Sequence, residues 1–281
     1  MNVTRVAVRG LCALLLAATV SCAQTPQAPI YEPEYSQPGK DVVWVPTSEI
    51  MVDTMMDLAK VTPDDYVIDL GSGDGRLVIG AAKRGARALG IEYDDNLVRY
   101  SIREAQKAGV SDKARFIQAD IFATDFSNAT VLTLFLLPEM NLRLRPLFLA
   151  MKPGTRIVAN YFGIGDWSSD ASVQLPQRTD KCGNYCTAYL WIVPAKVEGA
   201  WQLPQGELRL AQWHQFFKGT LGAAPVEQGH VRGDTLNFSA GGVSYRGRIN
   251  GDVIEGVMGE GGEGAEGAAP IKWTARRKPK D

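Results

Sequence analysis

The sequence predicts an α/β protein with a Rossmann-like, doubly wound, mostly parallel seven-stranded sheet, followed by a small antiparallel β module. Short β-rich runs alternate with helical stretches from about residue 42 to residue 196, which is typical of right-handed βαβ units. From about Gly199 the helical period disappears, and short runs are separated by Gly-Asp, Gly-Gly and Asn-Gly turns that favour hairpins. A glycine-rich loop at residues 71–75 directly follows the first strand of the alternating region.

The individual elements follow from local patterns. A first helix is expected after Pro46, where Thr47 or Ser48 can cap it and apolar residues recur at helical spacing. The predicted strands of the sheet are 66–70, 86–92, 114–118, 130–136, 155–161 and a late antiparallel strand at 187–193, and the predicted helices are 76–84, 96–108 and 142–151. In the β module, strands are predicted at 207–213, 235–240, 243–249, 252–258 and about 271–277, and the low-complexity stretch 259–270 predicts a mobile loop.

Composition limits the class of partner. The 281 residues include 30 basic and 31 acidic side chains, so no long-range field gathers nucleic acid or an anionic membrane. Nucleic acid is therefore not the expected partner. The predicted organisation is a signal peptide at 1–23, a linker at 24–41, the α/β domain at 42–196 and the β module at 197–281.

The N-terminus has the order of a secretory signal. Arg5 and Arg9 precede an apolar run at 11–20, and small residues end at Ala23, so we expect cleavage there and export to the periplasm or the exterior. A lipid on Cys22 is one alternative. An uncleaved anchor is another, but the run is shorter than the ~20 residues of a spanning helix. A start codon misassigned upstream of about Val42 would instead leave a cytosolic protein, with no transmembrane segment in the mature chain in any of the favoured cases.

Two cysteines lie outside the signal segment, Cys182 and Cys186. In an oxidising compartment a disulfide that closes this short Gly-Asn loop is the preferred interpretation. A zinc site needs about four ligands, and the two histidines of the chain, His214 and His230, lie far downstream. No metal is therefore expected.

The glycine loop Asp69-Leu-Gly71-Ser-Gly73-Asp-Gly75 excludes two common chemistries. A phosphate-binding P-loop needs Lys followed by Ser or Thr, whereas Arg76-Leu77 follows here. In a dinucleotide loop the third glycine comes one position later, and Asp69 and Asp74 flank the place of a negative pyrophosphate. Acidic residues suit a cationic ligand, and S-adenosylmethionine carries a sulfonium and an ammonium.

Two further strand ends complete a nucleoside site. Glu92 ends the second strand, where its carboxylate can accept hydrogen bonds from both ribose hydroxyls. Asp120 follows the third strand and can accept from the adenine amino group, with the backbone after it reading the ring. Taken singly, Asp69 can cap a helix, Glu92 can be a solvated charge and Asp120 can start a turn. Their combination with the loop favours the ligand site.

At this point the chain resembles class I S-adenosylmethionine-dependent methyltransferases. With VWVPT at 43–47, GSGDGRLVI, LVRYSIREAQKAGV, ARFIQADIF and GDWSSD taken together, it is similar to the small protein-lysine methyltransferases that modify the adenine nucleotide translocase and the c ring protein of the ATP synthase. The resemblance covers about 42–196 and none of the β module. It implies cofactor contacts at Asp69, Gly71, Ser72, Gly73, Gly75, Glu92, Asp120, Ile121 and Thr47.

The resemblance also suggests a methyl-acceptor side. Residues 136–140 match the Pro segment after the fourth strand, which places Leu137, Pro138 and Trp167 on the substrate side, although Trp167 can simply pack. Family members carry an amide beside that proline where this chain has Glu139. A lysine acceptor must lose a proton, since its reference pKa is about 10.4. Glu139 and Asp166 are the carboxylates that could orient or deprotonate it, and either can equally be a loop or capping residue.

Two classes of function remain at the level of the sequence. The first is a methyltransferase that acts on a protein lysine, on a membrane-associated or a soluble protein. Its difficulty is supply, because S-adenosylmethionine is made in the cytosol and is too polar to cross a bilayer unaided. The second is a non-catalytic envelope protein that keeps the sheet as a scaffold and binds a partner through the β module. Three glycines, each costly in conformational entropy, favour the enzyme.

Overall fold

The computed structural model describes residues 1, 31–176, 182–260 and 271–279. The predicted signal peptide after Met1, most of the predicted linker and residues 261–270 of the predicted low-complexity loop lie outside the described residues. Among the helices of the described ranges, none has the length and apolarity needed to cross a membrane.

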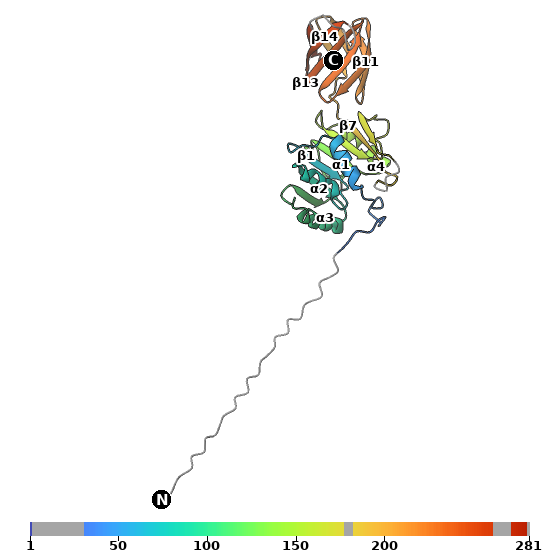
Figure 1. The fold of residues 1–281 in the computed structure, drawn as a ribbon. Helices are drawn as coiled ribbons and strands as arrows, with labels where there is room; N and C mark the ends of the chain where they lie inside the picture. The colour runs from blue at the N-terminus through green and yellow to red at the C-terminus, as the bar shows by residue number, and fades with distance from the viewer. Residues whose placement is uncertain (2–30, 177–181, 261–270, 280–281) are drawn as a thin grey trace. The chain divides into compact units, whose positions relative to one another are not determined.

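The predicted doubly wound sheet is confirmed. Seven strands lie in the order β3-β2-β1-β4-β5-β7-β6 (Figure 1). The first five are parallel neighbours, and β7 runs antiparallel to both β5 and β6. The bounds of the strands are β1 Tyr66–Leu70, β2 Arg87–Glu92, β3 Ala114–Gln118, β4 Val131–Leu134, β5 Arg156–Asn160, β6 Ala171–Gln174 and β7 Thr187–Ile192.

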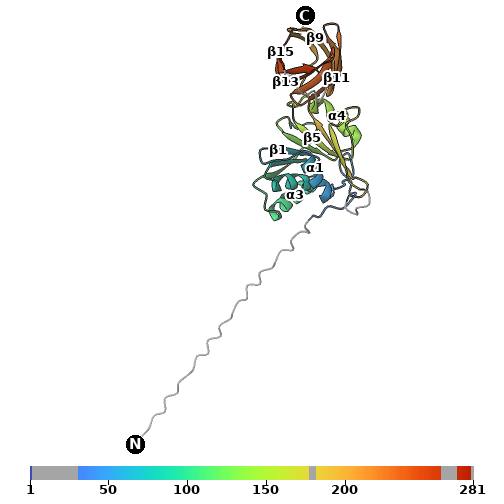
Figure 2. The same cartoon turned by 45° about the horizontal axis from the view of Figure 1, so that its top comes forward.

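Helices cover both faces of this sheet, and each face has its own core. The helices are α1 Glu49–Leu58, α2 Arg76–Lys83, α3 Asp95–Lys107 and α4 Pro138–Phe148. On one face, α1, α2 and α3 bury Met51, Met55, Val78 and Ala105 against one core cluster (Figure 2). On the other face, α4 buries Leu144 and Phe148. Because strand side chains alternate, Val67 and Ile68 of β1 fall into the two different cores.

The largest difference from the predicted elements is the start of α4, which begins at Pro138 instead of residue 142. Proline suits the first turn of a helix, since its fixed φ is helical and its missing N–H has no intrahelical partner there. Leu137, before it, has φ −62° and ψ 153°, an extended conformation that ends the preceding segment. The edge strand β6 has no counterpart among the predicted strands, because its residues are mostly exposed and show no alternating pattern.

The β module is a closed antiparallel barrel. Its strands are β8 Gly199–Leu203, β9 Gly206–Trp213, β10 Phe216–Leu221, β11 Ala224–Arg232, β12 Thr235–Ala240, β13 Val243–Asn250, β14 Val253–Glu260 and β15 Ile271–Arg277. The last strand pairs with the first through Arg276 and Gln202, which closes the barrel. Aromatic side chains fill the interior: the Phe238 and Tyr245 rings stack with centroids 4.6 Å apart, and Trp273 packs edge-on against both.

Candidate active site

The glycine loop leaves the sheet where β1 ends. Both Gly71 and Ser72 donate their backbone N–H to the carbonyl oxygen of Ile91, at 2.9 and 3.0 Å. Gly73 has φ +54°, in the left-handed region that a side chain disfavours. A Cβ on Gly73 would lie 2.5 Å from Nε1 of Trp44, so the backbone must be bare at this point.

Asp69 lies under this loop and is 2% exposed. Its Oδ1 accepts a hydrogen bond of 2.6 Å from Oγ1 of Thr133 on the neighbouring strand. Burial raises the pKa of Asp69 to about 8, the Thr133 hydrogen bond lowers it, and the negative charges of Glu92 and Asp74 raise it further. The carboxyl of Asp69 is therefore poised to titrate near neutral pH, and a cation placed beside it would favour the ionised form.

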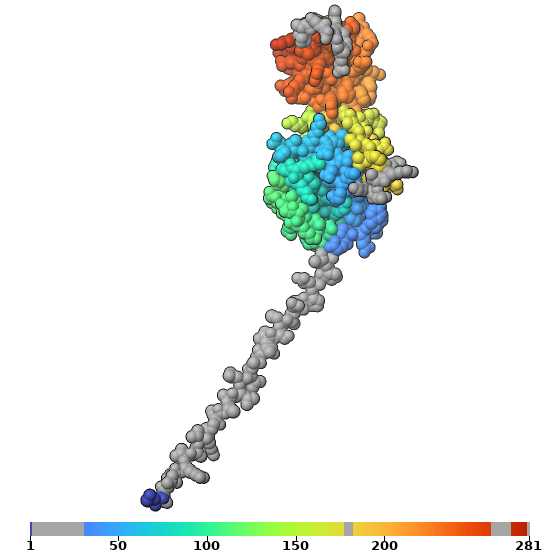
Figure 3. Space-filling model, viewed as in Figure 1, coloured from blue at the N-terminus to red at the C-terminus, as the bar shows by residue number. Residues whose placement is uncertain are grey.

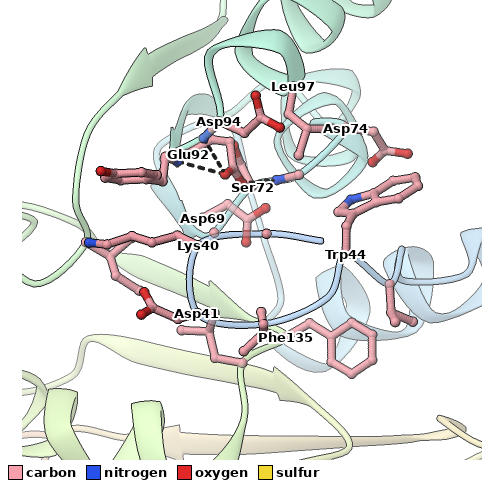
Figure 4. A pocket seen from close by; sticks show the side chains of 18 of the residues that line it. Lys40, Asp41, Trp44, Asp69, Ser72, Asp74, Glu92, Asp94, Leu97 and Phe135 are labelled. Atoms are coloured by element: carbon pink, nitrogen blue, oxygen red, sulfur yellow. Dashed lines mark hydrogen bonds between the residues drawn. The ribbon is translucent and has the colours of Figure 1, made fainter. Parts of the chain in front are cut away.

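Glu92 is held in position by the backbone around it. Its Oε2 accepts from the N–H of Gly73 at 2.8 Å, and its Oε1 accepts from Tyr93 at 2.7 Å and Asp94 at 3.0 Å (Figure 4). Three backbone donors fix both carboxylate oxygens at the carboxyl end of β2. Each oxygen has two acceptor sites, so the group can still accept from a ligand hydroxyl.

Asp120 follows β3 and carries an ion pair. Its Oδ2 lies 2.7 Å from Nζ of Lys40, and its Oδ1 accepts from the N–H of Phe122 at 2.9 Å. These contacts, the Lys40 hydrogen bond first, lower the pKa of Asp120. The Lys40 ammonium also lies 4.3 Å from the centroid of the Tyr93 ring. Lys40 falls in the predicted linker, since nothing in its local pattern indicates a contact 80 residues away.

A segment before α1, residues 37–47, crosses the site, and we call it the strap. It is turned back on itself by backbone bonds from Trp44 to Gln37 and from Ser36 to Trp44, at 2.9 and 3.0 Å. Figure 4 shows Lys40, Asp41 and Trp44 of the strap facing the glycine loop. In the space-filling view this early part of the described chain, in blue, lies at the surface of the sheet domain (Figure 3).

The strap and the strand ends together line one pocket. Of the residues expected to contact the cofactor, eight line it: Thr47, Asp69, Gly71, Ser72, Gly73, Glu92, Asp120 and Ile121. The ninth, Gly75, lies instead at the start of α2, where a Cβ would come within 2.8 Å of Cβ of Ser101. The pocket is less acidic than the sequence suggests, because Asp74 pairs with Arg76.

The residues predicted for the acceptor side are placed differently. Glu139 lies in the first turn of α4, and neither it nor Asp166 is among the residues that line the pocket. Asp166 forms an exposed ion pair with Arg145, whose hydrogen bond lowers the pKa of Asp166 and makes it a poor base. Trp167 is 1% exposed and packs against Trp191, so it belongs to the core.

The segment around Pro138 contributes to the pocket through its neighbours. Leu137 and Pro138 are absent from the lining, whereas Phe135, Leu136 and Met140 belong to it. A buried amide does brace this segment, three positions after the proline: Nδ2 of Asn141 donates to the carbonyl oxygen of Gly163 at 3.1 Å. The sequence pattern does not single out Asn141, because the predicted helix begins after it and leaves its burial unmarked.

A disulfide joins Cys182 and Cys186, the pairing expected from the sequence. Within the described residues no group of His, Cys, Asp or Glu is arranged to hold a metal ion.

Comparison with known proteins decides the family. Residues 69–171 match the family model described as the ANTKMT methyltransferase domain. A protein-lysine N-methyltransferase of Saccharolobus islandicus is 39% identical over 155 residues, which are 54% of this chain and 94% of that protein. The chain belongs to the ANTKMT methyltransferase family. It is a class I S-adenosylmethionine-dependent methyltransferase, and the non-catalytic scaffold is not favoured.

Two further relatives show the range of this family. A mouse enzyme, named as a lysine N-methyltransferase of the ATP synthase c ring protein, is 38% identical over 37% of this chain, and the matched part spans 42% of the mouse protein. A solved structure described as an RNA methyltransferase from Salinibacter ruber, in complex with S-adenosyl-L-homocysteine, is 43% identical with a TM-score of 0.50. It covers 54% of this chain and 96% of its own. The β barrel lies outside the family match of this methyltransferase.

The pocket of this methyltransferase fits the cofactor by its own donors and acceptors. The hydroxyl oxygen of Ser72 is buried in the lining and has no hydrogen-bond partner among the described residues, although buried polar atoms are nearly always paired. A bare glycine backbone, a fixed carboxylate at Glu92 and a titratable carboxyl at Asp69 surround it. These groups suit a cationic nucleoside with hydroxyls.

Proposed function

We propose that this chain transfers a methyl group from S-adenosylmethionine to the side-chain nitrogen of a lysine in a protein. The observation that carries the proposal is the pocket in which the strand ends of β1, β2 and β3 and the glycine loop converge. The relative that is named a protein-lysine N-methyltransferase and is matched over 94% of its length supports the choice of lysine.

In this proposal the residues of the chain bind and align. Glu92 holds the ribose, the backbone at Gly71 and Gly73 lies against the ligand, and Asp69 balances its positive charge. The cofactor, when bound, supplies a methyl group on a sulfonium, and in-line transfer asks mainly for alignment with the nucleophile. Phe135, Leu136 and Met140 border the same pocket with apolar surface. Apolar surroundings disfavour an ammonium, which eases loss of the proton from lysine.

The name of the Salinibacter ruber structure makes RNA the second candidate acceptor. The charge of the chain disfavours it, because 30 basic and 31 acidic residues leave no excess of positive charge for phosphates.

The test is transfer of a labelled methyl group from S-adenosylmethionine to three acceptor mixtures: membrane proteins, soluble proteins and total RNA. We expect label in protein, at lysine after digestion and mass analysis, and none in RNA. The Glu92→Ala variant is the control for cofactor-dependent transfer. Label confined to RNA, or equal transfer by the variant, would overturn the proposal. The membrane fraction tests whether the substrate is membrane-associated.

For the compartment, we propose export through residues 1–23, with cleavage after Ala23 or lipid attachment at Cys22. The disulfide supports this, because disulfides persist in oxidising compartments and are rare in the cytosol. Cell fractionation and sequencing of the mature N-terminus test it. A chain that begins at Gln24, or a lipidated Cys22, agrees with export, whereas a cytosolic chain that begins near Val42 excludes it.

A further inference from the structure

Four aromatic rings gather beside the cofactor pocket, and we call them the aromatic cluster: Phe135, Tyr161, Phe162 and Tyr185. The Tyr185 ring lies 5.1 Å from those of Phe135 and Tyr161, centroid to centroid, in edge-to-face contacts. Phe162 completes the group, at 5.1 Å from Tyr161 and 6.2 Å from Phe135. The rings come from three segments: the end of β4, the end of β5 and the disulfide loop.

The cluster is open to solvent and continuous with the pocket. None of its members is buried, and Tyr161 is 41% exposed. Large aromatic side chains usually lie in cores, so a solvent-accessible group of four marks a binding surface. Phe135 belongs to both the cluster and the pocket lining, and Figure 4 shows it on the opposite side of the pocket from Glu92. The cluster therefore borders the side away from the nucleoside carboxylates.

The backbone under the cluster is strained. Tyr161 has φ +65°, a left-handed conformation that is rare for a bulky residue. It is held there by bonds from its N–H to the carbonyl of Thr187, at 2.7 Å, and from the N–H of Phe162 to the carbonyl of Asn160, at 2.8 Å. Such strain gathers at binding and catalytic sites, where the surrounding structure fixes a side chain in one direction.

A second feature at the same strand end also points to a ligand. Asn160, the last residue of β5, is 1% exposed, yet neither its side-chain oxygen nor its nitrogen has a partner among the described residues. An amide in that state needs a polar partner from outside the chain, whether water or ligand.

We infer that the aromatic cluster binds the side chain of the acceptor lysine and guides its nitrogen toward the cofactor pocket. The inference rests on the proposed lysine methylation. Ring faces attract an ammonium or a methylated ammonium, and their edges pack against the aliphatic stem. This chemistry accepts lysine before and after a methyl group is added, because a methylated ammonium keeps its charge.

The disulfide has a positioning role in this arrangement. Tyr185 lies inside the ring that Cys182 and Cys186 close, and its N–H donates to the carbonyl of Cys182 at 3.0 Å. The covalent ring limits where the Tyr185 side chain can go, so the bond fixes one wall of the cluster.

The test compares two peptides that differ in one residue, lysine or its uncharged isostere norleucine, between glycine and alanine. Binding is measured by calorimetry to the full chain with S-adenosylhomocysteine present. We expect the lysine peptide to bind about tenfold more tightly than the norleucine peptide, a typical cation–π preference. Tyr185→Leu and Tyr161→Leu should abolish this ratio, whereas Tyr185→Phe should keep it. Trp213→Leu, an exposed ring on the barrel, is the matched control and should change nothing.

The outcomes separate this inference from the proposed function. Equal ratios in wild type and both leucine variants, with S-adenosylhomocysteine still bound, overturn the cluster as the lysine site even if lysine is methylated. No preference for the lysine peptide in wild type has the same meaning. A preference that the leucine variants lose, in a protein that transfers no methyl to lysine, supports the cluster and overturns only the function. Leucine variants that no longer bind S-adenosylhomocysteine would show a general disruption, which also contradicts a role confined to the acceptor.

Discussion

Asp69 gives the sharpest prediction, because its burial couples cofactor binding to a proton. In the ligand-free protein its pKa is about 8, so at pH 7 about nine in ten of its carboxyls carry the proton. A sulfonium or ammonium beside Asp69 favours the ionised carboxylate. Binding of S-adenosylmethionine at pH 7 should therefore release close to one proton, about 0.9 if Asp69 ends fully ionised.

The perturbation is Asp69→Asn, which keeps the shape and removes the titration. Calorimetry in two buffers of different protonation enthalpy counts the protons released. Wild type should release most of one proton at pH 7, Asp69→Asn none, and Asp74→Asn nearly as much as wild type, because Asp74 is paired with Arg76. The amino group of the ligand titrates in all three proteins alike, so its contribution cancels in the difference. Equal release by wild type and Asp69→Asn would refute this account of the site.

The same pKa predicts how stability depends on pH. The folded-state pKa of Asp69 lies above its ordinary value of 3.8, so the unfolded chain ionises first as pH rises. Asp69 therefore lowers the free energy of unfolding progressively from about pH 4 to about pH 8, by on the order of 1 kcal/mol per pH unit. Urea unfolding of the ligand-free protein at several pH values should show that slope, and Asp69→Asn should flatten it. A variant whose curve stays parallel to the wild type would contradict the buried carboxyl.

Three further changes have defined outcomes. Gly73→Ala should weaken binding of S-adenosylhomocysteine by at least about tenfold, because the new Cβ meets Trp44 in the pocket, while Gly251→Ala, with φ +59° and open space around it, should affect only stability. Replacing Cys182 and Cys186 together by serine should lower the free energy of unfolding by about 2 kcal/mol, measured with urea, since the bond closes a very short ring. Asp166→Asn should change stability by less than about 1 kcal/mol, as expected for an exposed pair, and leave the transfer rate nearly unaltered; a hundredfold slower transfer would restore Asp166 as a catalytic base.

The cofactor side could be predicted from the sequence because its contacts are local. Asp69, Glu92 and Asp120 each stand where a strand ends, and parallel strands bring their carboxyl ends to one edge without further information. Lys40 and Trp44 could not be predicted, since the strap has no periodic pattern and reaches the pocket only by tertiary folding. The closure of the barrel depends on the pairing of β15 with β8, which are separated by most of the module.

The acceptor side is harder to predict for a related physical reason. A cofactor of fixed chemistry requires the same residue types at the same strand ends, so a motif survives in the sequence. The proposed acceptor wall is assembled from rings that come from three loops, and each ring, taken alone, has the pattern of an ordinary core or loop residue. Carboxylates such as Glu139 and Asp166 draw attention because lysine must lose a proton, whereas the structure places aromatic surface beside the pocket.

The disulfide connects the acceptor side with the question of compartment. If the ring closed by Cys182 and Cys186 fixes Tyr185, then reduction should raise the KM for the acceptor while the affinity for the cofactor stays the same. Such a result would tie efficient transfer to an oxidising compartment, where S-adenosylmethionine has to be delivered from the cytosol. Transfer that is indifferent to reduction would instead free the activity from the disulfide and allow a cytosolic enzyme. Measuring both constants with and without reductant therefore tests the wall of the acceptor site and the compartment with one experiment.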